Sequence, residues 1–155
     1  DIFPPPSDAA QPRREDEAGL REATGWVRQL IDREIERGVP PGRIVLMGFS
    51  QGCAMTLMAG LRAPQRLAGL AGLSGYLPLA GALAREASPA NRDVPLFLAH
   101  GSDDDIVEPA RGEATRDALS AMGYPVQWHT YAMGHTVCPE EVADLNRWLL
   151  RVLVA

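Results

Sequence analysis

Residues 43–52 read RIVLMGFSQG, a short apolar run that leads directly into the pattern Gly-x-Ser-x-Gly. This pattern is typical of a serine held on a tight turn between a buried strand and a helix, with its hydroxyl exposed at the top of an α/β sheet. We expect side chains at Gly48 or Gly52 to collide with the neighbouring strand or helix, so glycine is needed at both positions. Ser50 then lies at a helix N-terminus, where backbone N–H groups favour developing negative charge.

The sequence around the motif supports the same arrangement. Residues 38–42 carry two glycines and two prolines and predict a turn, after which residues 44–47 predict a buried parallel strand. Residues 51–62 predict a helix. A serine in an ordinary loop is the simpler alternative, and it is less favoured because both flanking elements match those that the motif requires.

Helices and strands alternate along the chain. We expect an extended, Pro-rich loop over residues 1–12, helices over 15–37, 51–62, 79–86, 109–122 and 139–154, and strands over 44–47, 67–73, 94–100 and 126–131. This alternation predicts an α/β protein whose mostly parallel sheet carries helices on both faces. In such sheets, active sites gather at the carboxyl ends of the strands.

The composition narrows the range of functions. The chain has 155 residues, of which 46% are hydrophobic and 23% charged, and this is ordinary for one globular domain. A net charge of −5 gives no reason to expect a nucleic-acid partner or binding to an anionic membrane. No stretch is apolar enough for stable membrane insertion, and we expect a cytoplasmic protein. Cys53 and Cys138 are too few for a disulfide framework and are expected to be free thiols.

Three candidate residues follow predicted strands in an order that suggests nucleophilic catalysis. A serine hydroxyl needs a general base to activate it, and the base needs a third group to hold its orientation. In hydrolases with a Gly-x-Ser-x-Gly turn, the chain order is serine, acid, histidine. Here Ser50 comes first, an aspartate among residues 103–105 second, and His135 third.

The acid and the base each have alternatives. Three consecutive aspartates are also typical of a solvated turn, and two of residues 103–105 are expected to be only that. Of the three histidines, His100 ends a predicted strand and His129 lies within one, so structural roles are favoured for both. His135 lies in a glycine-containing loop after the last strand, where the general base is expected; otherwise it is a surface histidine.

Three segments together resemble a known family. GFSQG at 48–52, HGSDDDIV at 100–107 and YAMGH at 131–135 are similar to the bacterial carboxylesterase and acyl-protein thioesterase (phospholipase/carboxylesterase) family of α/β-hydrolases. The strand entry at 43–44 and the helix start at 138–141 also match, so the resemblance extends over nearly the whole chain. It implies an α/β-hydrolase fold without a large cap domain. It also implies that Asp104 is the acid, with Asp105 as second choice, and that Leu77 lines the acyl site.

The chain departs from the family at its N-terminal side. Family members begin with further strands and a His-Gly loop that supplies one of two oxyanion donors, whereas this sequence has the other, the backbone N–H of Gln51. We therefore expect residues 1–155 to form the C-terminal major part of a single α/β-hydrolase domain. The N-terminal strands are then expected on a separate N-terminal chain of the same protein, on a cleaved segment, or in residues outside this sequence.

The resulting prediction is a serine carboxylesterase that cleaves small-molecule esters of short to medium acyl chains, and thioesters, through an acyl-enzyme intermediate. No cofactor is expected, and no metal, because spacings such as His-Glu-x-x-His are absent from the sequence. Lysophospholipase or acyl-protein thioesterase activity is the first alternative, and a preference for acyl-chain length distinguishes it. A non-catalytic binding protein that keeps the fold is the second, and the complete set of candidate residues argues against it. The family resemblance also allows a homodimer.

Overall fold

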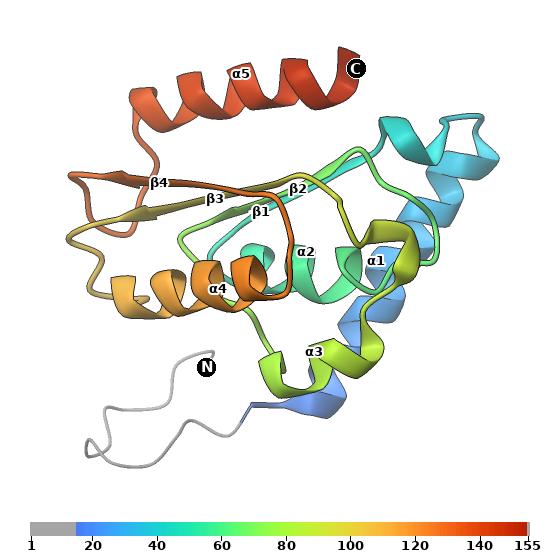
Figure 1. Cartoon of the computed structure of the whole chain (residues 1–155), viewed down its shortest axis with the longest axis horizontal. Helices are drawn as coiled ribbons and strands as arrows, with labels where there is room; N and C mark the ends of the chain where they lie inside the picture. The colour runs from blue at the N-terminus through green and yellow to red at the C-terminus, as the bar shows by residue number, and fades with distance from the viewer. Residues whose placement is uncertain (1–14, 155) are drawn as a thin grey trace.

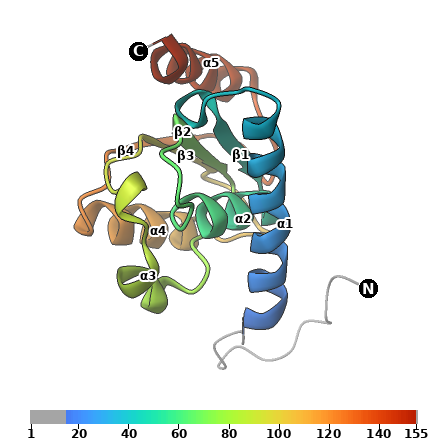
Figure 2. The same cartoon turned by 90° about the vertical axis from the view of Figure 1, so that its right-hand side faces the viewer.

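The structure is a computed structural model that describes residues 15–154, and the loop expected over residues 1–12 lies outside this range. Its helices and strands follow the predicted order, with boundaries that differ by one to two residues at most ends (Figures 1 and 2). They are α1 (Glu17–Glu36), β1 (Val45–Phe49), α2 (Gln51–Gly60), β2 (Gly69–Leu73), α3 (Ala80–Glu86), β3 (Leu96–Gly101), α4 (Pro109–Ala121), β4 (Val126–Tyr131) and α5 (Pro139–Val154). Two short 3-10 turns that were not expected, Pro41–Arg43 and Pro89–Asn91, each begin with proline.

The strands form a parallel sheet in the order β1-β2-β3-β4. Because each strand pairs with the next in sequence and parallel crossovers are right-handed, the connecting helices fall on one face. Helices α2 and α4 cover that face, α1 packs on α2, and α5 covers the opposite face after the last strand (Figure 1). The predicted parallel sheet with helices on both faces is therefore confirmed.

The core lies on both faces of the two central strands. Every residue of β2 and β3 is buried, as expected for parallel strands covered on both sides. On the α5 face, Phe97 and Ala71 pack against Leu145 and Trp148, and the ring of Trp148 occupies the space that a side chain at Gly69 would need. The segment between β2 and β3 carries only α3 and one 3-10 turn, so no cap domain is inserted there.

Strand β1 forms one of the two edges of the sheet within residues 15–154. Strand β1 pairs with β2 on one side only, and the side chain of Met47 is 56% exposed. Trp26 and Leu30 on α1 are exposed as well. This edge therefore presents apolar side chains beside a row of unpaired backbone groups. Among residues 15–154, no helix combines the length and the apolar character needed to cross a membrane.

Asn91 joins the 3-10 turn before β3 to the segment between α2 and β2, and we expect its loss to lower stability. Its side chain is fully buried, accepts a hydrogen bond from the Leu67 N–H (2.9 Å) and donates to the carbonyls of Ala63 (2.9 Å) and Gln65 (2.7 Å). Asn91→Ala leaves these groups without partners and should lower the free energy of unfolding by about 2–4 kcal/mol. Urea denaturation measures this change. Asn146→Ala, at an exposed position of α5, is the matched control and should change stability by less than about 0.5 kcal/mol.

Candidate active site

Ser50 lies on a strained turn between β1 and α2. Its φ is +55° and its ψ −118°, a region that residues other than glycine rarely adopt. The turn is held by hydrogen bonds, because the Ser50 N–H donates to the Leu73 carbonyl (2.8 Å) and the Ser50 carbonyl accepts from the Cys53 N–H (3.0 Å). The side chain is thereby presented at the carboxyl end of the sheet.

The two glycines of the motif differ in what surrounds them. A Cβ at Gly48 would lie 2.1 Å from the carbonyl carbon and oxygen of Gly52, so the expected collision with the helix is confirmed there. A Cβ at Gly52 would meet nothing within 4 Å among the described residues, so the expected collision at that position is wrong. The strand passes under the first turn of the helix at Gly48, whereas Gly52 faces a pocket.

His135 reaches Ser50 from the loop after β4. Its Nε2 lies 3.0 Å from Ser50 Oγ, and its ring packs against that of Phe49 with centroids 4.7 Å apart. The loop is tied to the one after β3, because the Ser102 N–H donates to the Tyr131 carbonyl (2.8 Å) and the Asp103 N–H to the Met133 carbonyl (3.0 Å). Two residues 85 positions apart in the chain therefore meet at one end of the sheet.

Asp104 is the aspartate that the structure places against His135. Its Oδ2 lies 2.8 Å from His135 Nδ1, and its Oδ1 accepts the backbone N–H groups of Ile106 and Val107, both at 2.9 Å. The sequence pattern did not choose among the three consecutive aspartates. In the structure, the other two, Asp103 and Asp105, are exposed. Ser50, His135 and Asp104 thus form a continuous hydrogen-bonded chain.

Burial and hydrogen bonding act in opposite directions on the Asp104 carboxyl. Burial raises the pKa of Asp104, but hydrogen bonds from His135 and from the backbone of Val107 and Ile106 lower it by more, and the net pKa is below the ordinary value. The carboxyl is therefore ionised at neutral pH and can stabilise a positive charge on His135.

The other two histidines occupy separate environments. His129, on β4, lies 3.5 Å from Asp144 through its Nδ1 and stacks against Phe97. His100, on β3, is fully buried and contacts the Val107 carbonyl. The histidine that contacts Ser50 is therefore His135 and not His129, whereas His100 lies beside Asp104.

The backbone N–H of Gln51, the oxyanion donor expected from the sequence, lies at the start of α2. Gln51 is the first residue of α2, and N–H groups in the first turn of a helix have no partner within the helix. It directly follows Ser50, and the positive end of the helix dipole lies at the same point. This N–H remains the predicted oxyanion donor beside the hydroxyl of Ser50.

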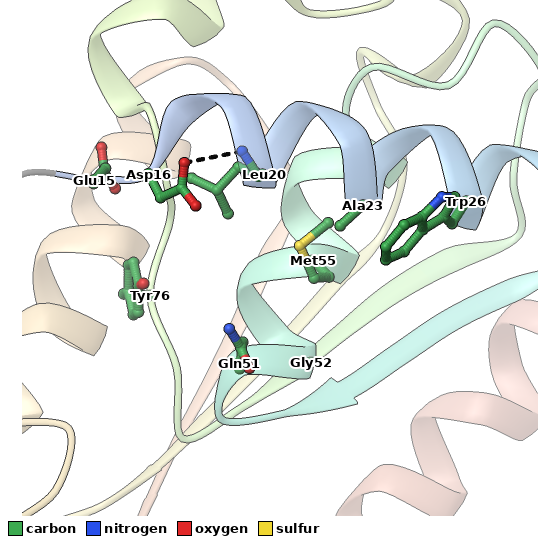
Figure 3. A pocket seen from close by; sticks show the side chains of 10 residues that line it. Glu15, Asp16, Leu20, Ala23, Trp26, Gln51, Gly52, Met55 and Tyr76 are labelled. Atoms are coloured by element: carbon green, nitrogen blue, oxygen red, sulfur yellow. Dashed lines mark hydrogen bonds between the residues drawn. The ribbon is translucent and has the colours of Figure 1, made fainter. Parts of the chain in front are cut away.

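A pocket of about 610 Å³ adjoins the turn, between the first half of α1 and the start of α2 (Figure 3). Its walls are mainly apolar, and Glu15 and Asp16 lie at one end. Tyr76 lines this pocket, whereas Leu77, the residue expected to line an acyl site, is buried in the core and borders only a smaller pocket of about 180 Å³. The sequence reasoning missed Tyr76, although it adjoins Leu77 in the same segment.

Two further buried groups, Cys53 and Glu141, have pKa values that burial raises. Cys53 and Cys138 are free thiols as expected, and burial raises the pKa of Cys53 to about 12. Burial also raises the pKa of Glu141 to about 7, against the opposing effect of the Cys138 backbone. A fully buried glutamate was not foreseen, because Glu140 and Glu141 look alike at the start of a helix. Within residues 15–154, no group of three or more His, Cys, Asp or Glu residues is arranged so that it could hold a metal ion.

Comparison with known proteins supplies relatives for this arrangement. The profile of a family described as phospholipase/carboxylesterase matches residues 7–153. Acyl-protein thioesterase 1 of Neurospora crassa is 44% identical over 154 residues, and that of Gibberella zeae 42% over 144 residues. These alignments cover 96% and 91% of the chain but only 62% and 61% of the two relatives. The crystal structure of Arabidopsis thaliana SOBER1 superposes with a TM-score of 0.86 at 31% identity, covering 90% of this chain and 67% of that one.

Proposed function

Because the chain belongs to the phospholipase/carboxylesterase family, we propose that it is the catalytic part of a serine hydrolase that cleaves carboxylic esters and thioesters. The observation that carries the proposal is the hydrogen-bonded chain from Ser50 Oγ through His135 to Asp104, with contacts of 3.0 and 2.8 Å. A nucleophile, a general base and an acid that orients the base are the three groups that acyl transfer needs.

In the proposed acylation step, His135 Nε2 takes the proton of Ser50 as the hydroxyl oxygen attacks the carbonyl carbon of the substrate. The negative charge that develops on the carbonyl oxygen is stabilised by the N–H of Gln51 and by the N-terminus of α2. The C–O or C–S bond then breaks, and His135 protonates the departing alcohol or thiol. Asp104 stays ionised throughout and stabilises the imidazolium.

In the proposed deacylation step, a water molecule replaces the alcohol or thiol. His135 takes a proton from the water, whose oxygen attacks the acyl-enzyme carbonyl, and the same N–H stabilises the second oxyanion. The ester bond to Ser50 breaks, and Ser50 regains its proton from His135. The cycle needs no metal, because side chains and backbone dipoles supply each proton transfer and each charge.

The proposed substrate class rests on the pocket that adjoins the Ser50 turn. The pocket beside Gln51 presents Leu20, Ala23, Trp26 and Met55, which suits an apolar acyl or alkyl group. Glu15 and Asp16 at its end disfavour an anionic group nearby, so uncharged esters are proposed in preference to lysophospholipids. The relatives named acyl-protein thioesterase 1 favour thioesters as the second candidate substrate. Hydrolysis rates for matched oxyesters and thioesters of increasing chain length separate these possibilities.

A fluorophosphonate probe tests the nucleophile directly. The full chain should gain the mass of one probe adduct, and Ser50→Ala should abolish labelling, because the oxygen that displaces fluoride from phosphorus is gone. Ser102→Ala is the matched control: Ser102 also follows a strand, but within residues 15–154 its hydroxyl hydrogen-bonds only to Asp103, so labelling should persist. Intact-mass spectrometry measures all three proteins. A folded wild-type chain that remains unlabelled, or labelling that survives in Ser50→Ala, contradicts the proposed function.

A further inference from the structure

A second histidine, His100, lies against the carboxylate of Asp104. Its Nε2 is 3.4 Å from Asp104 Oδ2 and 2.8 Å from the carbonyl oxygen of Val107. The side chains of His100 and Asp104 are 1% and 0% exposed. The ring thus connects the end of β3 to both the middle and the end of the loop that carries Asp104.

The contact with Val107 fixes the tautomer of His100. A carbonyl oxygen can only accept a hydrogen bond, so the hydrogen must be on Nε2. The same N–H lies close to Asp104 Oδ2, the oxygen that contacts His135. Oδ2 therefore has an N–H donor from each of two histidines nearby, while Oδ1 is held by the backbone of Ile106 and Val107.

The packing around His100 leaves its ring little freedom. A Cβ at Gly112, on α4, would lie 2.4 Å from His100 Nδ1, so only glycine at that position leaves room for the imidazole. On β4, the ring of Trp128 stacks against it with centroids 6.5 Å apart. The space between α4 and β4 thus holds the ring where Nε2 meets the loop over 101–107.

We propose that His100 is a positioning residue for the Ser50–His135–Asp104 chain: by joining the Val107 carbonyl to Asp104 Oδ2, it holds the loop over 101–107 so that Asp104 faces His135. This inference rests on the proposed function for its effect on catalysis. The alternative is a histidine that only fills space in the core. The two roles predict different results for a variant that keeps the volume of the ring but lacks the N–H: a positioning residue loses its effect on catalysis, whereas a residue that only fills space does not.

Three variants separate these roles. His100→Phe keeps a ring of similar size and removes the donor. His100→Gln keeps a donor that can reach the Val107 carbonyl. Gly112→Ala keeps histidine at position 100 but forces the imidazole ring to move. For His100→Phe and Gly112→Ala we expect kcat for ester hydrolysis to fall about 10–100-fold with KM changed less than about threefold, because small displacements of a reacting group have effects of this size. His100→Gln should recover most of the loss.

A spectroscopic readout keeps the inference testable independently of activity. In proton NMR of the full chain, the His135 Nδ1–H in its hydrogen bond to Asp104 should give a far-downfield signal, which is assigned by its absence in His135→Ala. The signal should persist in His100→Gln and be lost or broadened in His100→Phe and Gly112→Ala, while circular dichroism shows that the variants stay folded.

The outcomes distinguish the two proposals. If His100→Phe or Gly112→Ala folds and keeps both the downfield signal and the wild-type kcat, His100 is not a positioning residue. Should His100→Phe fail to fold, Gly112→Ala decides in the same way. If the wild-type chain hydrolyses no ester but its downfield signal depends on His100 as expected, the proposed function fails while the positioning role stands.

Discussion

Asp104→Asn should lower kcat by about 10⁴-fold with the fold intact, the size of effect seen when the acid of such a triad is made neutral. Asparagine keeps the size of the side chain but carries no charge, so it cannot stabilise the imidazolium that the proposed mechanism forms when His135 takes the proton of Ser50. Its amide can also favour the wrong tautomer of His135. Steady-state kinetics with a short-chain nitrophenyl ester measure the loss, and circular dichroism checks folding.

The neighbouring aspartates provide the matched controls for this prediction. Asp103 and Asp105 carry the same charge within one residue of Asp104, but both are exposed and neither contacts His135. Asp103→Asn and Asp105→Asn should therefore change kcat by no more than about threefold, since they alter only a solvent-screened charge. If Asp105→Asn lowered kcat as much as Asp104→Asn does, the assignment of the acid to Asp104 would be wrong.

Gly48→Ala should destabilise the chain by about 3 kcal/mol or more. The added Cβ would lie 2.1 Å from the backbone carbon and oxygen of Gly52 and 2.8 Å from the Cys53 nitrogen. No flexible side chain can move aside, so β1 and α2 must separate at the turn that presents Ser50. Overpacking against side chains typically costs about 1–3 kcal/mol, and rigid backbone places this case at or above the upper end. Urea denaturation measures the effect.

Gly52→Ala is the natural comparison, because it adds the same methyl group four residues along the same motif. That methyl group enters open space among the described residues, and alanine is favoured over glycine within a helix by up to about 1 kcal/mol. The variant should therefore be as stable as the wild type or slightly more stable. Equal destabilisation by the two substitutions would show that the close approach at Gly48 is not what the turn depends on.

The sequence pattern predicted much of the architecture. Apolar runs, turn residues and alternation identified every helix and strand, and the α/β-hydrolase fold expected from the resemblance is confirmed. Local pattern was sufficient because each element spans a continuous stretch with its own periodicity. The two 3-10 turns at Pro41–Arg43 and Pro89–Asn91 were missed, since a single turn is too short to have a period.

The finer features of the site depend on contacts between distant segments. The residue pattern alone could not choose Asp104 among three aspartates, because the choice depends on which carboxyl meets His135 once the loops after β3 and β4 are joined. The prediction of a collision at Gly52 was wrong for the same reason, because the space around a residue depends on elements elsewhere in the chain. Burial of Leu77 in the core, with Tyr76 facing the pocket, likewise becomes visible only in three dimensions.

The backbone hydrogen bonds that join the loop over 101–107 to the loop over 131–135 have a consequence for local opening. Amide groups of these two loops should exchange with solvent as one cooperative unit, whereas those around Ser50 belong to the β1–α2 turn. A transient opening of the β3–β4 half would then withdraw acid and base together. Ser50 would then have neither partner. Local opening would therefore switch the chain between a state with all three residues in contact and a state in which Ser50 has no base to activate it.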